Sequence, residues 1–94
     1  MRDDAFEWDD AKAVANEANH HVTFDVAREV FADPFAIDWQ DERENYGEDR
    51  YATVGMAFGR LLYVAYTVRG ERIRMISARR AEPFEQRLYH EDDA

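Results

Sequence analysis

The sequence contains no cysteine, and lysine occurs once, at Lys12, among the 12 basic residues of a 94-residue chain. Without cysteine, a disulfide framework, a thiol nucleophile and a cysteine-ligated metal are all excluded. No apolar run approaches the roughly 20 residues that a membrane span needs. The segment Met1-Arg2-Asp3-Asp4 is too polar to open a signal peptide. We therefore expect a cytoplasmic domain with no membrane partner.

Negative charge dominates the chain but is unevenly distributed. The 21 acidic residues give a formal net charge of −9, which argues against unaided nucleic-acid binding. Residues 1–49 carry −11, whereas residues 50–90 carry +5 because eight arginines lie there. Such asymmetry indicates an interaction surface, unless the two halves simply neutralise each other. Acid-rich composition with arginine in place of lysine is typical of a salt-rich cytoplasm; an acidic protein from a GC-rich genome is the alternative.

Hydrophobic periodicity predicts a single α+β domain over residues 1–94. The segment Phe6-Glu7-Trp8 suits either a short initial strand or a lead-in packed on the core. Helices are predicted over residues 10–19 and 24–32, the second ended by Asp33-Pro34. Alternating patterns predict strands over residues 35–39, 51–58, 61–69 and 72–78, with tight turns at Gly59-Arg60 and Gly70-Glu71. A last helix begins at Pro83. The predicted architecture is two N-terminal helices, a three- to four-stranded antiparallel sheet and a C-terminal helix, with the helices on one face of the sheet.

Arginines concentrate in the last predicted strand, which reads Arg72-Ile73-Arg74-Met75-Ile76-Ser77-Ala78-Arg79-Arg80. Arg69 and Arg50 close and open the two preceding strands. Guanidinium groups bind phosphate through paired hydrogen bonds and keep their charge at physiological pH. The pattern therefore predicts a site for an RNA backbone or a scissile phosphate. A surface lattice of arginine–carboxylate pairs is the alternative.

Other candidate groups carry weaker signals. His20 and His21 are adjacent, but no third ligand is spaced to complete a metal site, although either imidazole could transfer a proton. Glu48 and Asp49, which lie between Gly47 and Arg50, could supply a general base; a loop that is simply solvated is the alternative. The chain has no glycine-rich phosphate loop and no cofactor motif, so we expect no cofactor.

The ordered set of motifs resembles the BrnT family, toxins of a type II toxin–antitoxin system with a RelE/ParE-like fold. The resemblance covers about residues 6–89 and rests on Phe6-Glu7-Trp8-Asp9 with Lys12 and Asn16, on Gly47-Glu48-Asp49-Arg50, and on Arg72 to Ala81 with Tyr89. Two departures stand out. The family carries Lys-His-Gly where this chain has Asn19-His20-His21, and its toxins tend to be basic.

The resemblance implies a ribonuclease toxin that inhibits translation by cutting RNA. It also implies a BrnA-type antitoxin as partner, through which DNA would be bound only indirectly. The matching positions imply catalytic roles for Arg50, Arg79, Glu48 and His20, and substrate binding by Lys12, Arg69, Arg80 and Tyr89. The expected chemistry is metal-independent: the ribose 2′-OH attacks the adjacent phosphate while arginines stabilise the growing charge.

Two other functions stay open from the sequence. One is a catalytically inactive toxin-fold module that serves only as the antitoxin's partner in repression. The other is an interaction domain whose arginines pair with its own acids. The nuclease hypothesis expects the guanidinium groups of Arg50, Arg69 and Arg79 to converge on one cationic pocket.

Overall fold

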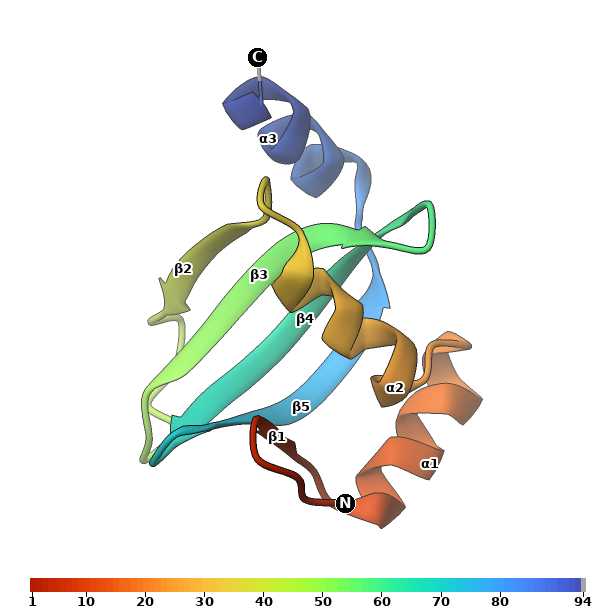
Figure 1. Ribbon diagram of the computed structural model, residues 1–94. Helices are drawn as coiled ribbons and strands as arrows, with labels where there is room; N and C mark the ends of the chain where they lie inside the picture. The colour runs from red at the N-terminus through yellow and green to blue at the C-terminus, as the bar shows by residue number, and fades with distance from the viewer. Residues whose placement is uncertain (94) are drawn as a thin grey trace.

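The computed structural model describes the backbone of residues 1–93 and the side chains of residues 1–91, and it confirms the predicted α+β class (Figure 1). The elements are, in order, β1 (Phe6–Glu7), α1 (Asp10–His20), α2 (Phe24–Ala27), a 3-10 helix (Arg28–Ala32), β2 (Ile37–Asp41), β3 (Arg50–Ala57), β4 (Arg60–Arg69), β5 (Arg72–Arg80) and α3 (Pro83–Asp93). Among these helices, none combines the length and apolar character needed to cross a bilayer.

The strands form one sheet in the order β1-β5-β4-β3-β2. Strands β2 to β5 are antiparallel to their neighbours, as the alternating patterns and tight turns predict. The two-residue β1 pairs parallel with β5 and makes the sheet mixed, with five strands instead of the three or four predicted. A run of two residues is too short to reveal its partner or its direction in the sequence.

Helix α1 lies along the part of β5 that β1 leaves unpaired. The Asp9 carboxylate accepts the Lys12 N–H at 3.0 Å and caps the first turn. The buried Asn16 side chain donates to the carbonyls of Val22 and Ala78 at 2.9 Å each. Its Oδ1 accepts the Ala78 N–H at 3.0 Å. One amide therefore satisfies three buried backbone groups and joins the helix to the strand edge.

The helix predicted over residues 24–32 is divided in two. Thr23 caps a four-residue α2, and the chain then tightens into the 3-10 helix. Val30 of that segment lies against Gly55 of β3, where an added Cβ would come within 2.8 Å of Val30 Cγ1. Glycine at this position lets the helical layer approach the sheet closely.

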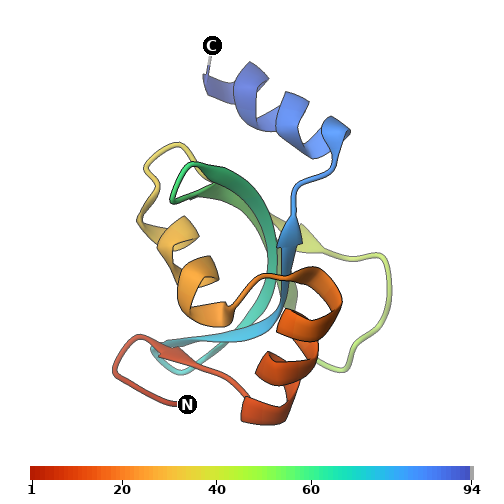
Figure 2. The ribbon, with the colours of Figure 1, turned by 90° about the vertical axis from the view of Figure 1, so that its right-hand side faces the viewer.

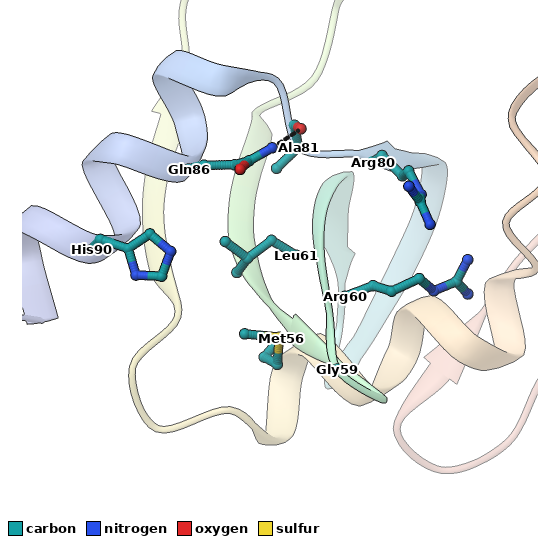
Figure 3. A pocket seen from close by; sticks show the side chains of 8 residues that line it. All are labelled: Met56, Gly59, Arg60, Leu61, Arg80, Ala81, Gln86 and His90. Carbon is teal, nitrogen blue, oxygen red and sulfur yellow. Dashed lines mark hydrogen bonds between the residues drawn. The ribbon is translucent and has the colours of Figure 1, made fainter.

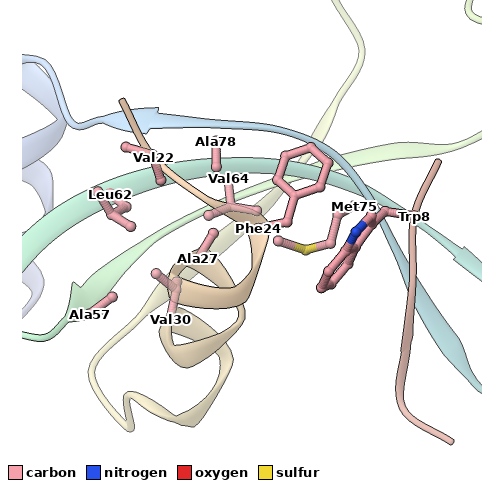
Figure 4. Packing of buried hydrophobic residues seen from close by; sticks show 10 residues of the cluster. All are labelled: Trp8, Val22, Phe24, Ala27, Val30, Ala57, Leu62, Val64, Met75 and Ala78. Carbon is pink, nitrogen blue, oxygen red and sulfur yellow. The ribbon is translucent and has the colours of Figure 1, made fainter. Parts of the chain in front are cut away.

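Apolar side chains form a core on each face of the sheet. The larger one lies under α2 (Figure 4) and consists of Trp8, Val22, Phe24, Ala27, Val30, Ala57, Leu62, Val64, Met75 and Ala78. The smaller one lies on the opposite face and consists of Ala52, Val54, Tyr63, Ala81 and Tyr89. Because Tyr89 belongs to α3, the prediction that all helices share one face is wrong. Figure 2 shows α2 on one side of the sheet and the loop after β2 on the other, which we call the open face.

Two local irregularities differ from the predicted alternation. The turn between β3 and β4 is Phe58-Gly59, not Gly59-Arg60, because Ala57 pairs with Arg60 and both turn residues have positive φ, 50° and 80°. In β5, Ser77 pairs with Ala65 and Met75 with Tyr66, so Ile76 is an extra residue. This bulge inverts the alternation, so that Arg79 lies opposite Tyr63 on the open face and Arg80 opposite Leu62 on the helix-covered face.

His21 occupies a backbone position that favours glycine. It follows α1 with φ 57° and ψ 31°, and its N–H bonds the Glu17 carbonyl at 2.9 Å. A left-handed residue after a helix is usually glycine, which explains the Lys-His-Gly pattern of the resembled family. We expect His21→Gly to raise the free energy of unfolding by about 1 kcal/mol, or the Tm by about 4–8 °C. Thermal unfolding measures the change. Asn19→Gly, inside the helix, should lower the Tm instead, and a loss in both variants would contradict the prediction.

Candidate active site

Glu48, Arg50 and Arg69 meet on the open face and are called the Glu48 cluster below. Arg50 begins β3, Arg69 ends β4, and Glu48 lies in the loop before β3. Arg50 Nε lies 3.4 Å from Glu48 Oε2, and Arg69 Nη2 lies 3.8 Å from Glu48 Oε1. The Arg50 guanidinium also stacks on the Tyr46 ring, 4.2 Å from its centroid. A carboxylate is thereby held between two cations.

The loop that carries Glu48 is fixed to the sheet at both ends. Gly47 has a φ of 73°, and its N–H donates to Asn45 Oδ1 at 3.1 Å. The hydroxyl of buried Thr67 on β4 donates to the Asp49 carbonyl at 2.6 Å. These bonds place Glu48 over the open face beside the ends of β3 and β4.

A second arginine–glutamate pair extends this polar region across the sheet. Arg74 pairs in register with Thr67 on one side and with Glu7 on the other. Its Nη1 lies 3.0 Å from Glu7 Oε2, and both side chains are largely buried, with 24% and 16% exposed. Together with the Glu48 cluster, this end of the open face holds three arginines and two glutamates.

Arg79 is engaged quite differently. Its two terminal nitrogens donate to Glu85 Oε1 and Oε2 at 2.8 and 2.9 Å, and its guanidinium stacks 4.1 Å from the Tyr63 centroid. Glu85 is only 2% exposed and also accepts the Glu82 N–H at the start of α3. The hydrogen bond to Glu85 raises the pKa of Arg79. The forked contact therefore fastens α3 to the sheet.

A groove of about 460 Å³ lies beside Arg79 on the open face, next to helix α3. It is lined by Trp39, Gln40, Asp41, Glu42, Arg43, Tyr63, Arg79, Glu82, Phe84, Glu85 and Leu88. Arg43 is held by Asp41 at 2.8 Å, a hydrogen bond that lowers the pKa of Asp41 to about 2. The lining of the groove has four acidic side chains, those of Asp41, Glu42, Glu82 and Glu85, and only two arginines. This groove is thus a poorer place for a phosphate than the Glu48 cluster.

The expectation of one cationic pocket is wrong. Arg50 and Arg69 share Glu48, whereas Arg79 pairs with Glu85 and lies opposite Tyr63. Tyr63 and Arg69 are six residues apart on β4, about 20 Å at the rise of a strand. Each of the three arginines is paired with a carboxylate, as the ion-pair alternative predicts.

Tyr89 is placed in the second core rather than at a substrate surface. It is 5% exposed, and its hydroxyl donates to Asp33 Oδ2 at 2.8 Å. Burial alone would raise the pKa of Asp33. The backbone N–H groups of Met56 and Phe35 and the Tyr89 hydroxyl hold it below its usual value. The Tyr89 contact joins α3 to the segment before β2.

Lys12 and His20 both lie on α1 and are exposed. Helix α1 and the start of β3 occupy opposite sides of the molecule in Figure 1, so neither side chain belongs to the Glu48 cluster. Among the described side chains, those of residues 1–91, no group of three or more from histidine, aspartate or glutamate is placed to hold a metal ion.

Two residues of interest were missed by the sequence reasoning. Tyr46 lies in a polar loop, where no hydrophobic periodicity indicates the position of its side chain. Arg60 follows a turn, and only the strand register places it near Arg80, which is itself exposed at the end of β5.

Comparison with known proteins identifies the family of the chain. A search of curated proteins finds no match. A scan against protein families matches residues 8–85 to the ribonuclease toxin BrnT of type II toxin–antitoxin systems. That match begins at Trp8, directly after β1, ends in the first turn of α3, and includes Glu48, Arg50, Arg69 and Arg79. The chain therefore belongs to the BrnT family of ribonuclease toxins, whose partners are antitoxins.

Proposed function

We propose that this toxin cleaves RNA without a metal ion, by transesterification at the Glu48 cluster. The observation that carries the proposal is the carboxylate of Glu48 held between the guanidiniums of Arg50 and Arg69 at 3.4 and 3.8 Å. A base beside two cations is what attack of a ribose hydroxyl on a phosphodiester requires.

In the proposed step, Glu48 accepts the proton of the ribose 2′-OH while O2′ attacks the neighbouring phosphorus. The bond from phosphorus to O5′ breaks, and O5′ takes a proton from water. The products are a 2′,3′-cyclic phosphate and a 5′-hydroxyl. Glu48 then returns its proton to solvent, which its one-third exposed side chain allows.

Arg50 and Arg69 stabilise the negative charge that grows on the phosphoryl oxygens. Their contacts with Glu48 are long and single, and each guanidinium carries five N–H donors, so donors remain for a phosphate. The Arg69 side chain is 56% exposed and can reach a bound strand. Both terminal nitrogens of Arg79, by contrast, donate hydrogen bonds to Glu85. We therefore assign the catalytic arginine role to Arg50 and Arg69, and a positioning role to Arg79.

No side chain of the Glu48 cluster is an evident general acid, because His20 and Lys12 lie on α1 and Tyr89 is buried. General acid–base help contributes about 10²–10⁴ in rate, so its absence on the leaving-group side implies slow turnover. In this proposal, Lys12 and His20 contact only RNA that extends past the cluster.

The proposed partner is a BrnA-type antitoxin that acts in the cytoplasm. An acidic segment of the antitoxin that covers the Glu48 cluster would neutralise its arginines and at the same time keep RNA out of the site. Binding of DNA would then occur through the antitoxin alone.

One observation favours an alternative, the inactive partner module: Arg50, Arg69 and Arg79 are all paired with the chain's own carboxylates. Growth arrest on expression without the antitoxin separates the two functions, because an inactive module leaves growth unchanged.

The proposed chemistry predicts cleavage that survives removal of divalent metal. Purified toxin treated with excess EDTA should cut single-stranded RNA at its untreated rate, and mass spectrometry should find 2′,3′-cyclic phosphate ends. RNA with 2′-deoxyribose at the cut site should stay intact, because the nucleophile is missing. Activity restored only by added magnesium, or 5′-phosphate products, would contradict the proposal.

A further inference from the structure

Arg60 and Arg80 differ from the other arginines of the sheet. Arg50, Arg69, Arg72, Arg74 and Arg79 each have an acceptor within 4 Å, either a carboxylate or, for Arg72, the Asp3 carbonyl. In the described part of the chain, Arg60 and Arg80 have neither a hydrogen bond nor an ion pair from their side chains. Their guanidinium donors are free.

These two side chains are also neighbours. Arg80 pairs with Leu62, and Arg60 is two residues before Leu62 on the same strand, so both side chains emerge on the helix-covered face as a diagonal pair. Figure 3 shows both guanidiniums extending to the same side of a hollow of about 410 Å³ between the β3–β4 turn and α3. The residues that line this hollow are Met56, Gly59, Arg60, Leu61, Arg80, Ala81, Gln86 and His90, with no acid among them.

Two like charges on adjacent strands repel each other and destabilise the sheet unless an anion lies between them. The chain has 21 acidic residues, yet none of those described pairs with Arg60 or Arg80. The pair is therefore suited to an anion from outside the chain. Phosphate fits best, because two guanidinium forks can share the oxygens of one phosphodiester or engage two successive ones.

We infer that Arg60 and Arg80 bind backbone phosphates of the RNA substrate, at a site distinct from the Glu48 cluster. This inference rests on the proposed function for the identity of the ligand. A protein with a net charge of −9 must gain affinity for a polyanion from local cationic contacts. The Glu48 cluster adds little to the affinity for RNA, because one glutamate partly neutralises its two arginines. Arg60 and Arg80 supply two uncompensated charges near the far end of β4. At the rise of a strand, Arg80, which lies opposite Leu62, is about 23 Å from Arg69, and Arg60 is about 30 Å from it.

The test is the salt dependence of RNA binding. The probe is a single-stranded 2′-O-methyl RNA of about 16 nucleotides, which cannot be cleaved and is long enough to span both sites. The variants are the double substitution Arg60→Gln with Arg80→Gln, and a charge-matched control, Arg2→Gln with Arg87→Gln. Arg2 and Arg87 are exposed, have no ion pair with any described side chain, and lie outside the β4–β5 pair.

We expect the Arg60/Arg80 variant to bind at least 10-fold more weakly at low salt. The slope of log affinity against log salt should fall by about 1.4, since each phosphate contact contributes about 0.7. The control should keep both the wild-type slope and the wild-type kcat at saturating RNA.

Three results would overturn the inference: an unchanged slope, an equal loss in the control, or weaker antitoxin binding with RNA binding intact. The last would assign the pair to the antitoxin. Failure of the proposed function is separable: wild-type toxin that binds the probe through Arg60 and Arg80 but cuts no RNA would contradict the catalytic proposal alone.

Discussion

Replacing Glu48 by glutamine is expected to lower the rate of RNA cleavage by about 10²–10⁴ while leaving RNA affinity nearly unchanged. Glutamine keeps the shape of the side chain but cannot take the proton of the 2′-OH. The variant also removes a negative charge that faces Arg50 and Arg69, so binding of a phosphate should if anything strengthen. Single-turnover cleavage of a labelled RNA, with affinity measured separately on 2′-O-methyl RNA, resolves the two effects.

Glu44→Gln is the matched control, since Glu44 lies exposed in the same loop without an ion pair and the change in charge is identical. It should cleave at the wild-type rate. Arg50→Ala and Arg69→Ala should each lose about 10²–10³ in kcat as donors to the transition state. Full activity in Glu48→Gln would remove this carboxylate from the mechanism.

Replacing Asn16 by alanine is expected to lower the free energy of unfolding by about 3 kcal/mol or more. The substitution leaves the Val22 carbonyl and both backbone groups of Ala78 without the Asn16 partner, and each unsatisfied buried group costs about 1–3 kcal/mol. A domain of this size has only about 5–14 kcal/mol in total. Urea denaturation followed by circular dichroism measures the change.

The control for that variant is Asn19→Ala on the same helix. Asn19 is exposed and makes no side-chain hydrogen bond, so its loss should change stability by no more than about 0.5 kcal/mol. Equal stability of the two variants would show that the amide of Asn16 is not what joins α1 to β5.

Local patterns predicted most of the fold. The helix over residues 10–19, the strand over residues 51–58 and the turn at Gly70-Glu71 each depend on a pattern of a few residues, and each forms within one residue of where it was expected. The differences arise from long-range contacts. Helix α3 packs on the open face because Glu85 binds Arg79 and the Tyr89 hydroxyl binds Asp33. Neither pairing follows from a hydrophobic periodicity in the sequence.

The site was less predictable for the same reason. The sequence identified Arg50, Arg69 and Arg79 as a group, but which carboxylate each guanidinium meets depends on strand register. Glu48 was among the predicted residues because it lies only two residues before Arg50 in the chain. Arg60 was not, since its relation to Arg80 exists only across β4 and β5.

The extra residue at Ile76 has a wider consequence for the two adjacent arginines at the end of β5. In a regular strand, Arg74 and Arg80 would share a side and Arg79 would lie on the reverse. The insertion exchanges the sides of Arg79 and Arg80. A single irregularity thus decides that Arg79 meets Glu85 of the C-terminal helix, and that Arg80 is the arginine turned away from that carboxylate.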